Sequence, residues 1–268
     1  MSQLLHYEQD DQGIVTLTMD DQSTRNALTG STMVDEFLAA FRRVEADPRV
    51  KVVIITGRGR AFSSGGNIDE MQRQQRPEFD GTVLRQEYRQ GIQRLPLALY
   101  GLEIPVIAAV NGPAMGAGLD LACMCDMRIA APEAVFAESF VKLGIIAGDG
   151  GAWFLPRIMG MSRAAEMTLT GDPIDAEQAL EWGLVSRVVP AQDLLAEARR
   201  LAARIAANPG QAVRMSKRLL REGQQARLDT VLEMAAAFQA IAHKTAEHAA
   251  AVDEFMQRRA QRKKQPAA

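Results

Sequence analysis

Hydrophobic and polar positions alternate along the first part of the chain as they do in paired strands. Residues 4–9 and 14–19 each show a period of two, and the turn-forming run 10–13 (DDQG) separates them. Residues 50–56 (VKVVIIT) are almost continuously β-branched, which is typical of a strand covered on both faces. We therefore expect a sheet with a hairpin at one edge and residues 50–56 near its centre.

Between the predicted strands, hydrophobic positions recur at helical spacing. Val34, Phe37 and Phe41 predict a helix that ends before Pro48. Residues 84–100 keep the same period and predict one further helix ahead of the next apolar strand. Strands and helices thus follow one another along the chain, which indicates the α/β class.

A strand, a glycine turn and a helix follow one another twice. The first unit spans residues 50–68, and the second spans residues 106–126 (VIAAVNGPAMGAGLDLACMCD). The structural unit repeats without repeating its sequence, which predicts stacked turns of a β/α spiral. A helix N-terminus offers free N–H groups and the positive end of a dipole, and glycines let a ligand approach them. Each glycine turn is therefore a place that can hold negative charge.

Beyond Pro190 every segment has a helical pattern. One apolar stripe consists of Leu194, Leu195, Ala198, Leu201, Ala202 and Ile205, and another of Leu228, Val231, Leu232, Ala235 and Phe238. We expect residues 1–190 to form the spiral ββα core with the ligand site. Residues 191–268 are expected to form a C-terminal helical region that packs on the core or on a neighbouring subunit and serves oligomerisation.

Composition excludes several classes of function. The 268 residues are 47% hydrophobic, enough for a large core, and the net charge of −2 does not favour nucleic acid or a membrane surface as a partner. The sequence shows no signal-peptide pattern and no apolar run of membrane-spanning length. The basic run 258–264 is expected to be a solvated helix end that frays, although it could also contact a phosphate.

The two cysteines give a prediction about compartment and metals. Cys123 and Cys125 lie two residues apart in an apolar segment, a spacing that fits neither a disulfide framework nor a zinc site. We expect buried thiols, no bound metal and a cytoplasmic protein.

The two glycine turns could form an oxyanion hole. If the N–H groups of Gly66 and Ala117 converge on one carbonyl oxygen, they stabilise an enolate or a tetrahedral intermediate. The alternative is that both are ordinary strand-to-helix turns. Nucleotide binding is not favoured, because neither a complete dinucleotide fingerprint nor a P-loop is present.

Proton transfer has to come from carboxylates, since the three histidines lie far from the glycine turns in the sequence. The candidates are Asp120, Glu138 and Asp149. An acid inside an apolar helix, such as Asp120, costs folding free energy unless it is paired or has a role in the chemistry of a site. Asp149 could instead cap the helix that follows it, and Glu138 could be a solvated residue at a strand end.

At these residues the chain resembles the crotonase (enoyl-CoA hydratase/isomerase) superfamily. The resemblance rests on AFSSGGNI at 61–68 and NGPAMGAGLDLACMCDMRIA at 111–130, with support from 151–157 and 169–190. It implies a crotonase-type spiral of repeated ββα units with a helical C-terminal region, assembled as a homotrimer or as a dimer of trimers. It also implies an acyl-CoA substrate as used in fatty acid metabolism, with coenzyme A as part of that substrate and no separate cofactor.

The resemblance also implies roles for single residues. The oxyanion donors become the N–H groups of Gly66 and Ala117, and the first hydratase glutamate corresponds to Asp120. The second hydratase glutamate corresponds to Phe140, which cannot transfer a proton and would instead form a wall of the acyl pocket. Asp149 is the natural substitute, because isomerases and a dehalogenase of the superfamily carry an acid on the same bend, at the position of Gly148.

By the same analogy the coenzyme A arm passes Arg25, Ala61 and Ile68. The implied reaction is hydration of an enoyl-CoA, the lyase activity of the family, or, as the second candidate, double-bond isomerisation through a thioester enolate. A crotonase-fold binding or scaffold protein without hydratase activity is an alternative. A serine peptidase of related spiral architecture is a more distant one, since no G-x-S-x-G motif is present.

Overall fold

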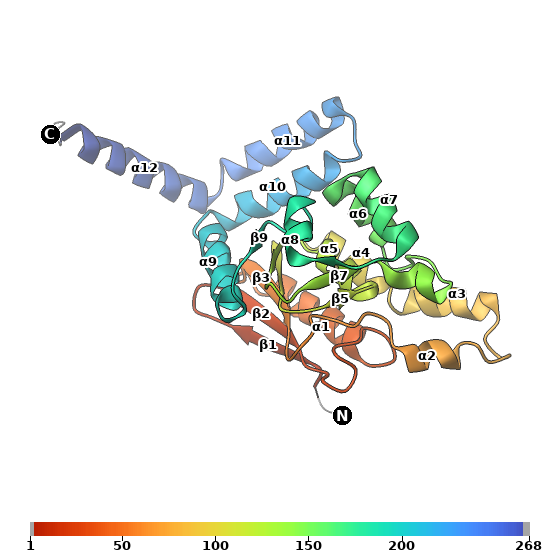
Figure 1. Cartoon of the computed structure of the whole chain (residues 1–268). Helices are drawn as coiled ribbons and strands as arrows, with labels where there is room; N and C mark the ends of the chain where they lie inside the picture. Colours follow the sequence, from red (N-terminus) through yellow and green to blue (C-terminus); the bar gives the residue numbers. More distant parts are fainter. Residues whose placement is uncertain (1–2, 265–268) are drawn as a thin grey trace.

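The computed structural model describes residues 3–264, and its main sheet has six strands in the order β1-β2-β3-β4-β6-β9 (Figure 1). The β1–β2 pair is the predicted antiparallel hairpin, and the later neighbours all pair in parallel. Their bounds are β1 (Leu5–Gln9), β2 (Ile14–Met19), β3 (Val52–Gly57), β4 (Val106–Val110), β6 (Met127–Ala130) and β9 (Arg187–Val188).

Helices cover both faces of this sheet, which is why its central strands are apolar on both sides. On one face, α1 (Met33–Ala46) buries Phe37 and Phe41 in the larger core cluster. On the other face, α9 (Leu194–Ala206) packs its alanines against Ile54 and Ile107 in a second cluster. Helix α9, which follows residue 190, thus packs on the sheet of the core. The division of the chain into two regions at residue 190 stays a prediction.

A second, three-stranded sheet lies beside the first, in the order β5-β7-β8. It consists of β5 (Ala114–Met115), β7 (Val135–Ala137) and β8 (Ile174–Asp175). Helices α5 (Ala117–Met124) and α8 (Ala176–Glu181) contact this sheet. The other short helices of this part of the chain are η1 (Ser139–Leu143), α6 (Gly151–Met159), α7 (Met161–Thr170) and η2 (Ala191–Asp193).

The single helix expected over residues 84–100 is wrong. The structure has α3 (Gly81–Gln90) and α4 (Arg94–Gly101), preceded by α2 (Ile68–Arg73). The break lies at Gly91, whose backbone angles of φ −100° and ψ −112° are not helical. A glycine adopts such a conformation at little steric cost, and the hydrophobic period continues across it, so the pattern alone does not reveal the break.

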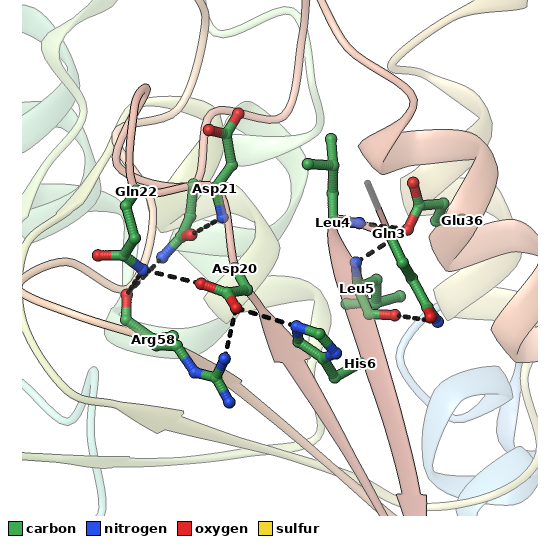
Figure 2. A network of polar contacts seen from close by, with 10 residues as sticks. Gln3, Leu4, Leu5, His6, Asp20, Asp21, Gln22, Glu36 and Arg58 are labelled. Carbon is green, nitrogen blue, oxygen red and sulfur yellow. Dashed lines mark hydrogen bonds and ion pairs between the residues drawn. The ribbon is translucent and has the colours of Figure 1, made fainter. Parts of the chain in front are cut away.

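Polar contacts fix the N-terminal edge of the sheet and the loop that follows β2. Asp20 accepts hydrogen bonds from His6 and Arg58, and the Glu36 carboxylate accepts from the backbone N–H groups of Leu4 and Leu5 (Figure 2). These contacts hold β1 on α1 and anchor the start of the loop 20–27, which leads to the candidate site.

The last three helices differ in how they join the core. Helix α10 (Gly210–Glu222) is tied to it by Lys217, whose ammonium group donates to the Ile104 carbonyl and pairs with Asp126, both at 2.6 Å. Helix α11 (Leu228–Ala242) lies along α10 and has no buried residue, and α12 (Ala246–Lys264) projects from the body of the molecule (Figure 1).

Two further predictions about this end of the chain can be compared with the structure. The basic run 258–264 belongs to α12, and residues beyond 264 lie outside the described part of the chain. Throughout residues 3–264, no helix is both long and apolar enough to span a membrane.

Candidate active site

The two glycine turns lie side by side, because their segments pair. Ser63 and Ala114 form a parallel bridge, and the Met115 N–H donates to the Ser63 carbonyl at 3.0 Å. Gly65 has φ +85°, and a Cβ atom on it would overlap the Met115 carbonyl and lie 3.1 Å from the Ala117 nitrogen. Only glycine permits this approach, which brings the turn at residues 65–66 to the N-terminus of α5.

Each turn presents an unused backbone donor. Within the described residues, the N–H groups of Gly66 and Ala117 donate no hydrogen bond. Ala117 is the first residue of α5, so its N–H lies at the positive end of the helix dipole. The structure thus brings together the two segments that the sequence predicted as an oxyanion hole, and their role in catalysis stays a prediction.

Two cavities meet at Gly66, one of these donors, and Gly116, the residue before the other donor, lines the first of them. A cavity of about 410 Å³ and another of about 370 Å³ share Gly66, Met71 and Phe140 in their walls. The first is also lined by Ser23, Thr24, Arg25, Ala27, Ser64, Asn67, Ile68, Asp69, Met115, Gly116, Ser139 and Leu143. The second extends among α1, α2 and α3 and has Tyr88 and Asp149 in its wall. A ligand that occupies both would pass Gly66 at the junction.

The three predicted contacts for the coenzyme arm have different environments. Arg25 and Ile68 line the first cavity, and Ile68 is 60% exposed. Arg25 has φ +57°, an uncommon conformation for a side-chain-bearing residue, which is held by the buried Asn26 beside it. Ala61 is buried and lines neither cavity, and its carbonyl accepts hydrogen bonds from Asn26 and Asn111.

Three carboxylates lie buried behind the junction of the cavities. Asp120 and Glu138 have no exposed surface, and Asp149 is 4% exposed. Among the described residues, no donor satisfies either oxygen of Asp120 or Glu138, nor Oδ1 of Asp149. Burial without a cation raises the pKa of a carboxyl group because it disfavours the charged form. It raises the pKa of Asp149 to about 6 and the pKa of Asp120 and Glu138 well above their usual values.

Gly151, at the start of α6, lies against two of these acids. A Cβ atom on Gly151 would overlap an oxygen of Glu138 and an oxygen of Asp120 at once, so the two carboxylates lie against the same Cα. Neither of them lines a cavity, whereas Asp149 does. The three acids therefore form two layers, with Asp149 at the cavity wall and the other pair behind it.

Two of the alternative interpretations from the sequence are wrong. Glu138 is not a solvated strand-end residue, because it has no exposed surface. Asp149 does not cap the following helix, because the N-cap of α6 is Gly150 and no side chain caps it. No clear signal in the sequence indicates the burial of Glu138, because Phe136 and Ala137 on opposite faces of β7 are both buried and no alternation marks one face as the core.

Aromatic rings complete the walls of the site. The Phe140 ring packs against Gly116, directly before the Ala117 donor, and the Tyr88 ring packs against Gly148, directly before Asp149. Burial, followed by the charge of Asp149, raises the pKa of the Tyr88 hydroxyl. The two rings therefore lie beside the residues that directly precede the Ala117 donor and Asp149.

The cysteines and the C-terminal histidines take no part in this arrangement. Cys123 and Cys125 are buried free thiols, as predicted, and burial raises the pKa of both. His243 contacts His248 between α11 and α12. In the part of the chain that the structure describes, no group of three or more His, Cys, Asp or Glu residues is placed to hold a metal ion.

The spiral arrangement of parallel strands and the paired glycine turns define a crotonase-fold protein, as the sequence predicted. The model of the enoyl-CoA hydratase/isomerase family matches residues 9–266, and the chain belongs to this family.

Similar proteins and a similar crystal structure agree with this assignment. The 1,2-epoxyphenylacetyl-CoA isomerase of Escherichia coli is 33% identical over 93% of this chain and 94% of its own length. The crotonyl-CoA hydratase of Syntrophomonas wolfei is 38% identical over 83% of this chain and 84% of its own length. The crystal structure of an enoyl-CoA hydratase from Bacillus anthracis superposes with a TM-score of 0.89 at 31% identity, and the match covers 96% of this chain and 97% of that one. The family includes both hydratases and isomerases, so membership leaves the reaction open.

Proposed function

We propose that this protein is an enzyme that converts an enoyl-CoA through a thioester enolate. The observation that carries the proposal is the pair of unused N–H groups, Gly66 and Ala117: Gly66 lines both cavities at their junction, and Ala117 directly follows Gly116, which lines the first cavity. Such donors, fixed in a water-poor site, stabilise the negative charge that develops on the thioester oxygen. The family membership and the names of the relatives support an acyl-CoA as the substrate.

The two cavities suit the two ends of such a substrate. The coenzyme arm would occupy the cavity with Arg25 and Ile68, where the guanidinium group can meet a phosphate and the isoleucine can contact the adenine or the pantetheine chain. The acyl group would occupy the cavity with Tyr88 and Asp149. The thioester carbonyl would then lie at Gly66, where the cavities join.

Of the two candidate reactions, isomerisation is the one that the geometry favours. Moving a double bond requires one carboxylate that removes a proton from one carbon and returns it to another. Asp149 is in the cavity wall, and its pKa of about 6 leaves it mostly ionised at neutral pH and therefore able to act as the base. The oxyanion donors hold the enolate between the two proton transfers.

Hydration is the second candidate, supported by the hydratases among the relatives. It needs one group that deprotonates water and one that protonates the α-carbon. Phe140 can do neither, so Asp120 and Asp149 would have to supply both roles. Asp120 lines neither cavity, which makes this pair less suited to the reaction than a single carboxylate in the wall is to isomerisation.

Enone absorbance distinguishes the two reactions. With trans-3-enoyl-CoA, an isomerase produces the conjugated product and the absorbance rises; with trans-2-enoyl-CoA, a hydratase removes conjugation and the absorbance falls. We expect a rise with the first substrate and a loss of about a hundredfold or more in Asp149→Asn. The exposed acid Asp253 provides a control, since Asp253→Asn should keep the wild-type rate.

If the wild type turns over a substrate and both Asp120→Asn and Asp149→Asn keep its full rate, the proton-transfer assignment is wrong. If the protein binds coenzyme A thioesters but converts none of them across a series of chain lengths, the scaffold alternative holds. If it binds none, the acyl-CoA assignment itself fails.

The C-terminal helices support a proposal about assembly. Leu228, Leu232 and Ile241 on α11 are 73%, 58% and 57% exposed, and such apolar surface is costly in water. We infer that a neighbouring subunit covers α11 in a homotrimer or a dimer of trimers. Light scattering on the purified protein tests this, and Leu232→Glu should yield smaller particles, whereas Gln12→Glu, which adds the same charge on the exposed turn between β1 and β2, should not. A monomeric wild type would contradict it.

A cytoplasmic location also belongs to this proposal. The two buried free thiols support it, because disulfides are rare where thiols are kept reduced. Cell fractionation followed by detection of the protein tests it.

A further inference from the structure

Glu138 is a buried acid to which the proposed reaction gives no role. It follows β7 directly, has no exposed surface, and lies against Gly151 together with Asp120. Its two oxygen atoms have no donor among the residues that the structure describes. An unsatisfied buried carboxylate is costly, and two that touch the same Cα are more costly still, because their charges repel each other.

The surroundings provide no opposite charge. The titratable groups that face the pair are Asp149 on the bend before α6, Cys123 on α5, and Tyr88 on α3 beyond Asp149. Among the described ion pairs, none involves Asp120, Glu138 or Asp149. All the neighbours are thus acids, and none stabilises a second negative charge.

One proton resolves this conflict. Two ionised carboxylates are both acceptors, so neither can satisfy the other, whereas a protonated carboxyl group donates a short, strong hydrogen bond to an ionised one. We propose that Glu138 is a positioning residue, which keeps its proton at neutral pH and donates it in a hydrogen bond to the carboxylate of Asp120. Asp120 is then the ionised member of the pair.

The surroundings of the two carboxyl groups indicate which of them keeps the proton. Burial and the charges of Asp120 and Asp149 all raise the pKa of Glu138. Burial and the charge of Asp149 raise the pKa of Asp120 as well, but the Glu138 carboxyl group opposes that rise. Asp120 also lies on the first turn of α5, where the positive end of the helix dipole favours a negative charge, so Asp120 is the ionised member and Glu138 keeps the proton.

The consequence for catalysis rests on the proposed function. Asp120 lies on the first turn of α5, three residues after the Ala117 donor. A hydrogen bond from Glu138 fixes the Asp120 carboxylate in orientation and charge at that turn. The second carboxyl group of the site thus comes from position 138, and not from position 140, where Phe140 stands.

The presence of the proton can be tested without any substrate. Infrared spectroscopy of the wild type at about pH 8 should show the carbonyl band of a protonated, buried carboxyl group, since Asp149, with a pKa of about 6, is ionised there. The band should vanish in Glu138→Gln and persist in Asp149→Asn and in Glu133→Gln, a matched control in which an exposed glutamate on the loop before β7 is changed. A wild type without the band, or a band that survives in Glu138→Gln, overturns the proposal.

Activity on the enoyl-CoA that the wild type converts gives a second readout. The side-chain amide introduced by Glu138→Gln still donates a neutral hydrogen bond, so this variant should keep kcat within about threefold, whereas Glu138→Leu should lower kcat at least about tenfold with little change in KM. An ionised Glu138 acting as a base would instead make Glu138→Gln as inactive as Glu138→Leu, which contradicts the proposal. If no enoyl-CoA is converted, the proposed function fails, while the infrared result still decides the state of Glu138.

Discussion

The Phe140 ring lies 3.4 Å from the point that a Cβ atom on Gly116 would occupy. The contact places an apolar ring at the position where the resemblance to hydratases implies a second glutamate. It also fills the space directly before the Ala117 donor. In the proposed function, the contact between Phe140 and Gly116 therefore bears on both the choice of reaction and the placement of the oxyanion hole.

A carboxyl group at position 140 should increase hydration. Phe140→Glu places an acid in the wall shared by both cavities. We expect hydration of trans-2-enoyl-CoA at least about tenfold faster than in Phe140→Gln, which has the same size and cannot transfer a proton. The fall in enone absorbance measures it. Equal rates in the two variants would show that position 140 does not select the reaction.

Gly116 should not tolerate a side chain. Its backbone angles are φ 49° and ψ −119°, so Gly116→Ala is strained by about 1–3 kcal/mol, and the new methyl group presses on Phe140. We expect lower thermal stability and, because the Ala117 N–H moves, a kcat reduced at least about tenfold.

Gly144 provides the matched control for this change. It has φ +70° and open space around the missing Cβ, so Gly144→Ala should lose about 1–2 kcal/mol of stability and keep kcat. Equal losses of kcat in both variants would mean that backbone strain in general, and not the donor at residue 117, limits the rate.

The rate should depend on pH through Asp149. Its pKa is raised to about 6 by burial, and the ionised form is the base. We expect kcat/KM to be constant above about pH 7 and to fall about tenfold per pH unit below pH 6. A profile that shows no fall between pH 7 and 5 would exclude Asp149 as the base.

The same group should make the folded protein less stable as the pH rises. Between pH 4 and 6 the folded state holds a proton on Asp149 that the unfolded chain has lost, so the free energy of unfolding falls as the pH increases through this window. Asp149→Asn removes this penalty and should raise stability at pH 7.5 by up to about 3 kcal/mol, and by little at pH 4.

Thermal unfolding at the two pH values measures the difference, with Asp253→Asn as the control on the exposed surface of α12. A stability gain that is the same at both pH values would point to a cause other than the buried charge. The expected variant is more stable and less active, which is common where a buried charge serves catalysis.

Local pattern determined much of the fold. The alternation in residues 4–19 gave the β1–β2 hairpin, and the β-branched run at 50–56 gave the central strand β3. These predictions succeeded because the period of hydrophobic positions directly reflects which faces are covered. The pattern failed at Gly91, where a backbone break leaves the period unchanged.

The sequence by itself determined the family, through the motifs at 61–68 and 111–130, and with it the two glycine turns as the candidate oxyanion hole. Only the tertiary structure decided which acids lie together. Glu138 and Asp120 meet at Gly151 because β7, α5 and α6 pack there, and Asp149 alone of the three reaches the cavity wall. The physical reason is that the burial and charge of one polar side chain depend on segments far away in the sequence, whereas strand and helix periods are local.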